Sequence, residues 1–186
     1  MDRQILWDCH MHSSFSADSD TPMEVMIHRA VETGLQGITF TEHLDPDYPV
    51  TPDNLDFSLD IPAYKEKLAE LSDIYKDKIQ VRFGIELGLQ MHLGEYFDSL
   101  LSQTPFDFVI GSSHLVHGYD PYYPEFFEGR KEFLCYMGIF LNPFLKTFPH
   151  MTDLMFTDIL IMLSVMVLTR TGNILTDGIK IFWMRF

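Results

Sequence analysis

The sequence contains little of what several common protein classes require. Among its 186 residues are only two cysteines, Cys9 and Cys135, too few for a disulfide framework. We therefore expect a protein of the reducing cytoplasm. Lysine and arginine number 13 against 27 acidic residues, which gives a net charge of −14. Because phosphate backbones need clustered basic residues, nucleic acid is excluded as an expected partner.

Signals for export or membrane insertion are also scarce. The N-terminus has no apolar signal-peptide core after its single arginine. The segment Met155–Leu168 is shorter than the ~20 apolar residues of a spanning helix and includes Asp158, so we expect no membrane partner. No glycine-rich phosphate loop, Ser-His-Asp order or internal repeat indicates another route to function.

Candidate metal ligands, in contrast, recur along the first 114 residues. Each follows a stretch predicted to be a strand, and the carboxyl ends of parallel strands meet at one edge of a sheet or barrel. One histidine at a strand end is more often a capping or solvent-facing residue. The same residue class closing four successive strands instead favours a site for Zn, Mn or Fe. The candidates are His10, His12, Asp18, His43, Glu86 and His114.

Helical patterns between these strands predict an α/β fold. We expect helices over Pro22–Thr33, Ile61–Tyr75 and Glu95–Leu101. Two long loops, 46–60 and 119–127, are rich in acidic and aromatic residues. They suit a small cationic substrate, although ordinary solvated loops explain the same composition.

The strand-end motifs resemble those of the PHP (polymerase and histidinol phosphatase) superfamily. The segment 8–18 of this chain, Asp-Cys-His-Met-His-Ser-Ser-Phe-Ser-Ala-Asp, is similar to the opening motif of that superfamily. The segments 41–43, 84–88 and 111–114 are similar to its next three motifs, in the same order. Residues 114–123 are most similar to the histidinol-phosphatase branch. The resemblance extends to about residue 132 and implies a distorted (β/α)7 barrel, incomplete in this chain.

The resemblance also implies a chemistry, the hydrolysis of a phosphate monoester, most simply histidinol phosphate in histidine biosynthesis. Glu86 and His114 would be catalytic, and His117 would contact the substrate. Two alternatives stay open: a defective or non-catalytic fragment that binds metal, and a PHP phosphoesterase for another small phosphate ester. The implied cofactors are up to three divalent metals, held by His10, His12 and Glu86, by Glu86 and His114, and by Asp18 and His43.

Three further carboxylates, Asp8, Glu42 and Asp45, are neighbours of these candidates in the sequence. A carboxylate that accepts a hydrogen bond from an imidazole orients it toward a metal. Each of the three is therefore a candidate for orienting a ligand. A solvated loop carboxylate is the equal alternative at each position.

The composition changes abruptly near residue 133. Residues 1–132 hold 24 of the 27 acidic and 9 of the 13 basic residues, whereas residues 133–186 have a net charge of +1. No glutamate follows Glu132, although barrel exteriors are normally rich in Glu, Lys and Gln. We predict that 1–132 is the barrel portion and that 133–186 is an aberrant hydrophobic tail rather than a functional domain.

A shift of reading frame after about Lys131 would explain this tail. The family has a Gly-His-x-Asp-Tyr motif and an Asp-x-His pair, and neither is found in the tail, where His150 is the only histidine. One allowed set of codons for Thr157–Thr176 also encodes a second peptide when reading starts at the third nucleotide. That peptide is Gly-His-Phe-Asp-Tyr followed by a charged segment. We therefore expect an out-of-frame tail and impaired activity, since a complete barrel needs about 250 residues.

Overall fold

The computed structural model describes residues 6–115 and 118–129. The predictions for His117, for the segment Met155–Leu168 and for an out-of-frame tail lie outside these residues. Within the described part, no helix is long and apolar enough to cross a membrane.

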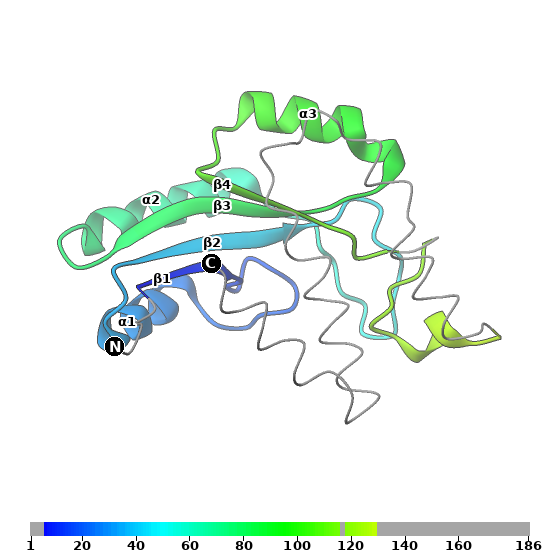
Figure 1. The fold of residues 1–186 in the computed structure, drawn as a ribbon, viewed down its shortest axis with the longest axis horizontal. Coiled ribbons are helices and arrows are strands. Elements are labelled where there is room, and N and C mark those ends of the chain that lie inside the picture. Colours follow the sequence, from blue (N-terminus) through cyan, green and yellow to red (C-terminus); the bar gives the residue numbers. More distant parts are fainter. Residues whose placement is uncertain (1–5, 116–117, 130–186) are drawn as a thin grey trace, which may run out of the picture.

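Four parallel strands form one curled sheet, and they lie side by side in chain order (Figure 1). They are β1 (Trp7–Met11), β2 (Gly37–Leu44), β3 (Gln80–Gly88) and β4 (Phe108–Ser112). Helices separate successive strands, so each crossover returns the chain to the same end of the sheet. The α/β class is confirmed, and the four described strands correspond to one side of a barrel.

Three α-helices and two short 3-10 helices connect the strands. The helix α1 ends because Gly34 adopts the left-handed region at φ 81°, where its N–H bonds to the carbonyls of the last turn. The helix α3 runs further than predicted and ends before Pro105, because a residue preceding proline avoids helical geometry. The short helix η2 occupies part of the predicted 119–127 loop and buries Phe126. The bounds are α1 (Met23–Thr33), α2 (Ile61–Tyr75), η1 (Met91–Leu93), α3 (Gly94–Gln103) and η2 (Pro124–Phe127).

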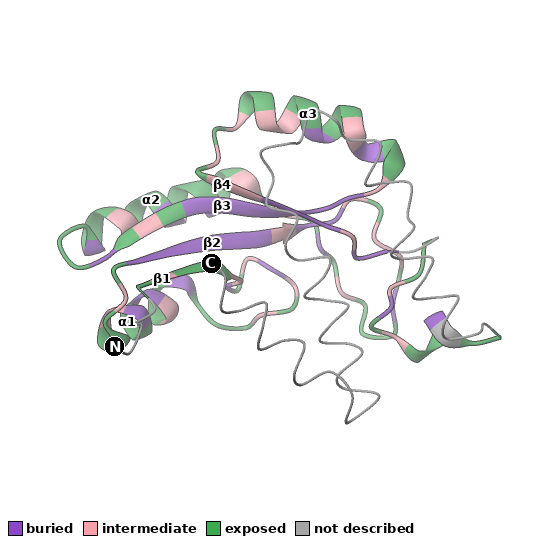
Figure 2. Ribbon diagram, in the orientation of Figure 1, coloured by how far each residue is buried: buried purple, intermediate pink, exposed green. Residues whose placement is uncertain are grey.

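The helix α2 covers β2 and β3 with one apolar face, and Figure 2 shows these two strands as mostly buried. Its start is fixed by Asp60, whose carboxylate accepts the N–H of Ala63 at 3.0 Å. Tyr64 is fully buried and donates its hydroxyl to the carbonyls of Phe40 (3.0 Å) and Gly84 (2.9 Å). One phenol therefore ties the helix to two neighbouring strands. The predicted apolar face is confirmed, since its four members are all buried: Tyr64, Leu68, Leu71 and Tyr75.

A second apolar cluster lies nearer the carboxyl ends of the strands. Leu44 of β2 and Leu87 of β3 pack there with Phe97, through which α3 contacts the sheet. Burying a side chain of this size stabilises the fold by about 1.5–3 kcal/mol. The two clusters pack against β2 and β3. This packing fixes the positions of the polar residues at the carboxyl ends of these two strands.

Candidate metal centre

All six predicted ligands converge at the carboxyl edge of the sheet. The strand β2 carries His43 next to its last residue, and the register places it directly beside Glu86 of β3. Two neighbouring parallel strands thus point an imidazole and a carboxylate to the same side. The other four ligands come from β1, from the loop after it and from the segment after β4: His10, His12, Asp18 and His114.

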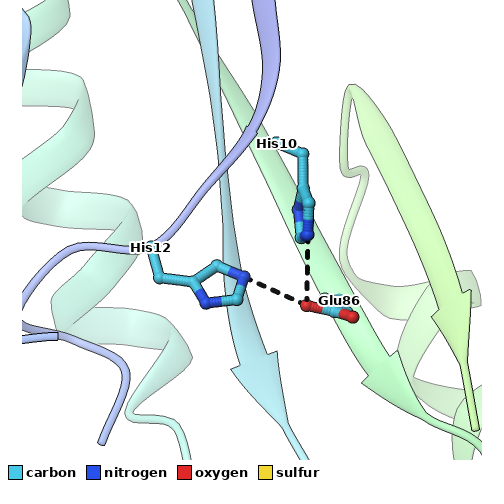
Figure 3. Close-up of side chains that lie close together, drawn as sticks. All are labelled: His10, His12 and Glu86. Atoms are coloured by element: carbon cyan, nitrogen blue, oxygen red, sulfur yellow. Dashed lines mark ion pairs between the residues drawn. The ribbon is translucent and has the colours of Figure 1, made fainter. Parts of the chain in front are cut away.

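Glu86 is the common partner of the imidazoles. Its Oε2 atom lies 3.8 Å from Nε2 of His10, 3.0 Å from Nε2 of His12 and 3.5 Å from Nδ1 of His43. Its Oε1 atom lies 3.0 Å from Nε2 of His114. Figure 3 shows His10 of β1 and His12 of the loop that follows, both with a ring nitrogen toward this carboxylate.

Asp18 provides a second carboxylate on the other side of the cluster. Its Oδ2 atom lies 3.0 Å from Nδ1 of His12 and 3.6 Å from Nε2 of His43. Both imidazoles therefore lie between Asp18 and Glu86, one nitrogen toward each. The ligand atoms form three overlapping groups, each within 4.8 Å: His10, His12 and Glu86; His12, Asp18 and His43; His43, Glu86 and His114.

The centre has a buried floor and an open rim. The side chains of Glu86 and His114 are only 3% and 8% exposed, whereas those of His10 and Asp18 are 39% and 38% exposed. A small molecule would therefore approach from the side of His10 and Asp18. The floor excludes water from the carboxylate that all four imidazoles share.

The charges at the centre are strongly coupled. Burial acts to raise the pKa of Glu86, but the imidazoles of His114 and His12, which face its carboxylate, outweigh burial and hold that pKa well below its usual value. Burial acts to lower the pKa of His114, and the charge of Asp45 with that of Glu86 raises it well above 6.5. For His12, Asp18 and Glu86 overcome burial and raise the pKa to about 9. Binding of a cation here displaces these protons.

The donor atoms fit a divalent metal. Seven buried side-chain atoms in the described part of the chain have no hydrogen-bond partner, although such atoms in proteins normally have one, and four of the seven lie in this centre. These atoms point toward one another, which suits a cation among them. Imidazole nitrogen with carboxylate oxygen is a donor set for Zn, Mn or Fe. The atoms are Nε2 of His12, Nδ1 of His43, Oδ2 of Asp45 and Oε2 of Glu86.

Asp45 orients two of the imidazoles, as its position beside His43 predicts. Its Oδ1 atom lies 2.5 Å from Nδ1 of His114, so Nε2 of that ring faces Glu86. Its Oδ2 atom lies 3.4 Å from Nδ1 of His43. The carboxylate lies against Gly88, where an added Cβ would come within 1.8 Å of Oδ1. A glycine at this position is therefore required for Asp45 to reach His114.

Glu42 has a different role from the one its position predicts. It is fully buried, so it is not a solvated carboxylate, and it binds the loop after β1 rather than a ligand imidazole. It accepts the N–H of Ser13 at 3.0 Å, the hydroxyl of Ser13 at 2.5 Å and that of Ser16 at 2.7 Å. The hydroxyl of Ser16 also accepts the N–H of His43 at 2.9 Å. Glu42 thereby fixes the turn that connects His12 with Asp18.

The hydroxyl of Thr41 is a contributor that the sequence analysis missed. It lies 2.7 Å from Nδ1 of His10, which leaves Nε2 of that ring facing Glu86. A signal was present, because Thr41 precedes His43 by two residues and so shares its face of β2. Asp8, in contrast, is exposed and accepts the backbone N–H of His10 at 3.2 Å.

Comparison with known proteins identifies the family. A family model for the PHP domain matches residues 8–147. The chain belongs to the PHP family. The match continues beyond residue 132, and the boundary predicted there stays a prediction.

Similar PHP proteins include a histidinol-phosphatase of Lactococcus lactis, 36% identical over 115 residues, which are 62% of this chain and 41% of that protein. The crystal structure of histidinol phosphate phosphatase from that organism, complexed with Zn, L-histidinol and phosphate, has a TM-score of 0.67 and 33% identity. That match covers 73% of this chain and 50% of the other. The chain therefore spans half the length, or less, of these relatives.

A structure from Listeria monocytogenes, from the same group of phosphatases by its description, has a TM-score of 0.52 and 18% identity. It covers 58% of this chain and 44% of that one, and it supports the PHP fold alone.

Proposed function

We propose that this PHP chain hydrolyses histidinol phosphate to histidinol and phosphate with the help of divalent metals. The observation that supports it most is the convergence of four imidazoles on one buried carboxylate, Glu86, in a chain similar to a phosphatase solved with Zn, histidinol and phosphate. A cytoplasmic location and a role in histidine biosynthesis belong to the same proposal.

The proposed metal positions follow the three groups of ligand atoms. His10, His12 and Glu86 would hold one metal, and Glu86 and His114 would hold a second. Asp18 and His43 would hold a third, with His12 in the same group of ligand atoms. Metals at these positions would lower the pKa of a bound water and neutralise phosphoryl oxygens.

The remaining residues of the centre prepare it for a phosphate group. Among the described residues, three carboxylates lie between the imidazoles, Asp18, Asp45 and Glu86, so two or three divalent cations would leave the centre net positive despite the acidic chain. The phosphate enters over the exposed rim at His10, while the buried floor keeps His114 and Glu86 in fixed orientation. The oxygen of a water bonds to phosphorus, the P–O bond to histidinol breaks, and the leaving oxygen takes up the proton that the water gives up.

The test uses the full chain, stripped of metal and reloaded with Zn or Mn. We expect phosphate release from histidinol phosphate that depends on metal and is lost in Glu86→Gln. The matched control is Glu32→Gln, the same change at an exposed glutamate of α1. Metal binding without phosphate release would support the alternative of a non-catalytic fragment. Release from other phosphate esters at equal rate would support a different phosphoesterase.

We also propose that residues 133–186 are an out-of-frame tail. The change of composition near residue 133 supports this. Intact mass spectrometry of the protein from its native host tests it, since the sequence corresponds to 21.7 kDa. A larger mass with peptides of the other frame supports a sequence error, and a mass of 21.7 kDa shows that the tail is translated as written.

A further inference from the structure

Two loops beside the metal centre are joined by a reciprocal pair of hydrogen bonds. Tyr48, in the loop after β2, donates to Asp120 in the segment after β4. Tyr123 of that segment donates back to Asp53 at 3.2 Å. Each loop thus supplies one phenol and one carboxylate. We call these four residues the cross-loop clamp.

The bond between Tyr48 and Asp120 is the better anchored half of the clamp. The other carboxylate oxygen of Asp120 accepts the N–H of Tyr122 at 2.7 Å, which holds the carboxylate in place. Burial and the charge of Asp120 raise the pKa of Tyr48, so its hydroxyl stays a donor. A hydrogen bond to a charged acceptor is stronger than one between neutral groups.

Contacts lead inward from Tyr48 to the imidazoles. The ring centroids of Tyr48 and Phe57 lie 4.6 Å apart. The centroid of Phe57 lies in turn 5.1 Å from that of His43. The backbone N–H of Asp45 bonds to the carbonyl of Phe57 at 3.1 Å, and the N–H of Tyr48 bonds to the carbonyl of Asp45 at 3.3 Å. Asp45 in turn contacts both His43 and His114. The clamped loop therefore includes the residues that orient two of the ligands.

We propose that Tyr48 is a positioning residue, whose bond to Asp120 sets the orientation of the two imidazoles that Asp45 contacts. The proposal rests on the proposed metal centre, because its main consequence is a change in metal affinity. Ligands that are already in place lose less conformational entropy when a metal binds. Partners that orient metal ligands typically contribute about 10- to 100-fold to affinity.

The first experiment is Tyr48→Phe in the full chain. The substitution keeps the ring on Phe57 and removes only the hydroxyl. We expect Zn affinity, measured by competition with a chromogenic chelator, to fall about tenfold. In the metal-free protein, amide hydrogen exchange should increase in both loops, 45–60 and 118–128. Tyr96→Phe, at a half-exposed tyrosine of α3 outside the clamp, is the control and should change neither.

Two changes at Asp120 distinguish loss of the bond from loss of the charge. An asparagine can accept the N–H of Tyr122 with its oxygen and donate its amide to the phenol oxygen, which also accepts. Asp120→Asn should therefore stay close to the unmodified protein, and Asp120→Ala should resemble Tyr48→Phe. Because Tyr48→Phe and Asp120→Ala both remove the bond between Tyr48 and Asp120, the variant with both changes should bind Zn no more weakly than Asp120→Ala alone.

The outcomes separate this proposal from the proposed function. If Tyr48→Phe lowers the melting temperature but leaves Zn affinity unchanged, the positioning role is overturned. Exchange that increases in the 45–60 loop alone overturns the clamp itself. If the unmodified chain binds no Zn, the proposed function fails and the positioning proposal fails with it, while hydrogen exchange in the metal-free protein still tests the clamp.

Discussion

The substitution Glu42→Gln tests how much the carboxylate of Glu42 stabilises the turn between His12 and Asp18. Glu42 is fully buried and accepts bonds from three donors on two serines. A hydrogen bond to a charged group contributes about 1.5–3 kcal/mol, and one between neutral groups about 0.5–1.5 kcal/mol. Replacing the charge therefore costs about 1 kcal/mol for each donor, or about 3 kcal/mol for the turn.

Two measurements follow from this estimate. In urea unfolding, a slope of roughly 2 kcal/mol per molar converts the loss into a midpoint lowered by about 1–2 M. The bound Zn per chain should also fall, because His12 and Asp18 lie at the two ends of the turn. Glu32→Gln on the exposed face of α1 is the control, expected to change stability by less than about 0.5 kcal/mol. Equal midpoints and equal Zn content in the two variants would refute the reasoning.

Three further predictions concern other parts of the structure. Gly88→Ala should weaken Zn binding by tenfold or more, since the new methyl group displaces the carboxylate of Asp45; unchanged affinity by chelator competition would contradict this. Tyr64→Phe should lower the free energy of unfolding by about 1–3 kcal/mol, because two strand carbonyls lose a buried donor; urea titration checks it. The metal-free chain should lose stability as pH rises: the pKa of His12 is about 9 in the fold against 6.5 unfolded, so its stabilisation is complete below pH 6.5 and lost through pH 9. Melting curves from pH 6 to 9.5, with and without Zn, measure this, and a flat metal-free profile would count against it.

The local elements were predictable because local signals agree. The helix Ile61–Tyr75 has its predicted bounds, since Asp60 caps its start and one face is apolar throughout. The ligands were predictable for a related reason. Parallel strands place their carboxyl ends together, so residues at those ends meet whatever the details of packing.

The supporting contacts were not predictable, because they join residues far apart in the chain. Asp45 reaches His114 across 69 positions, and the space for it depends on Gly88 in a third segment. Glu42 lies beside His43 in the sequence, yet it points away from that imidazole and into the serine turn. Neighbouring residues of a strand face opposite sides, and only the fold shows what each side meets.

The order of the strands has a consequence for the synthesis of the protein. Each strand joins the one made just before it, and the six candidate ligands lie between residues 10 and 114. Chains fold from the N-terminus as they leave the ribosome. The cluster can therefore assemble on a nascent chain once residue 114 has left the ribosome. Zinc captured at that stage would join the four strands before the synthesis of the chain is complete.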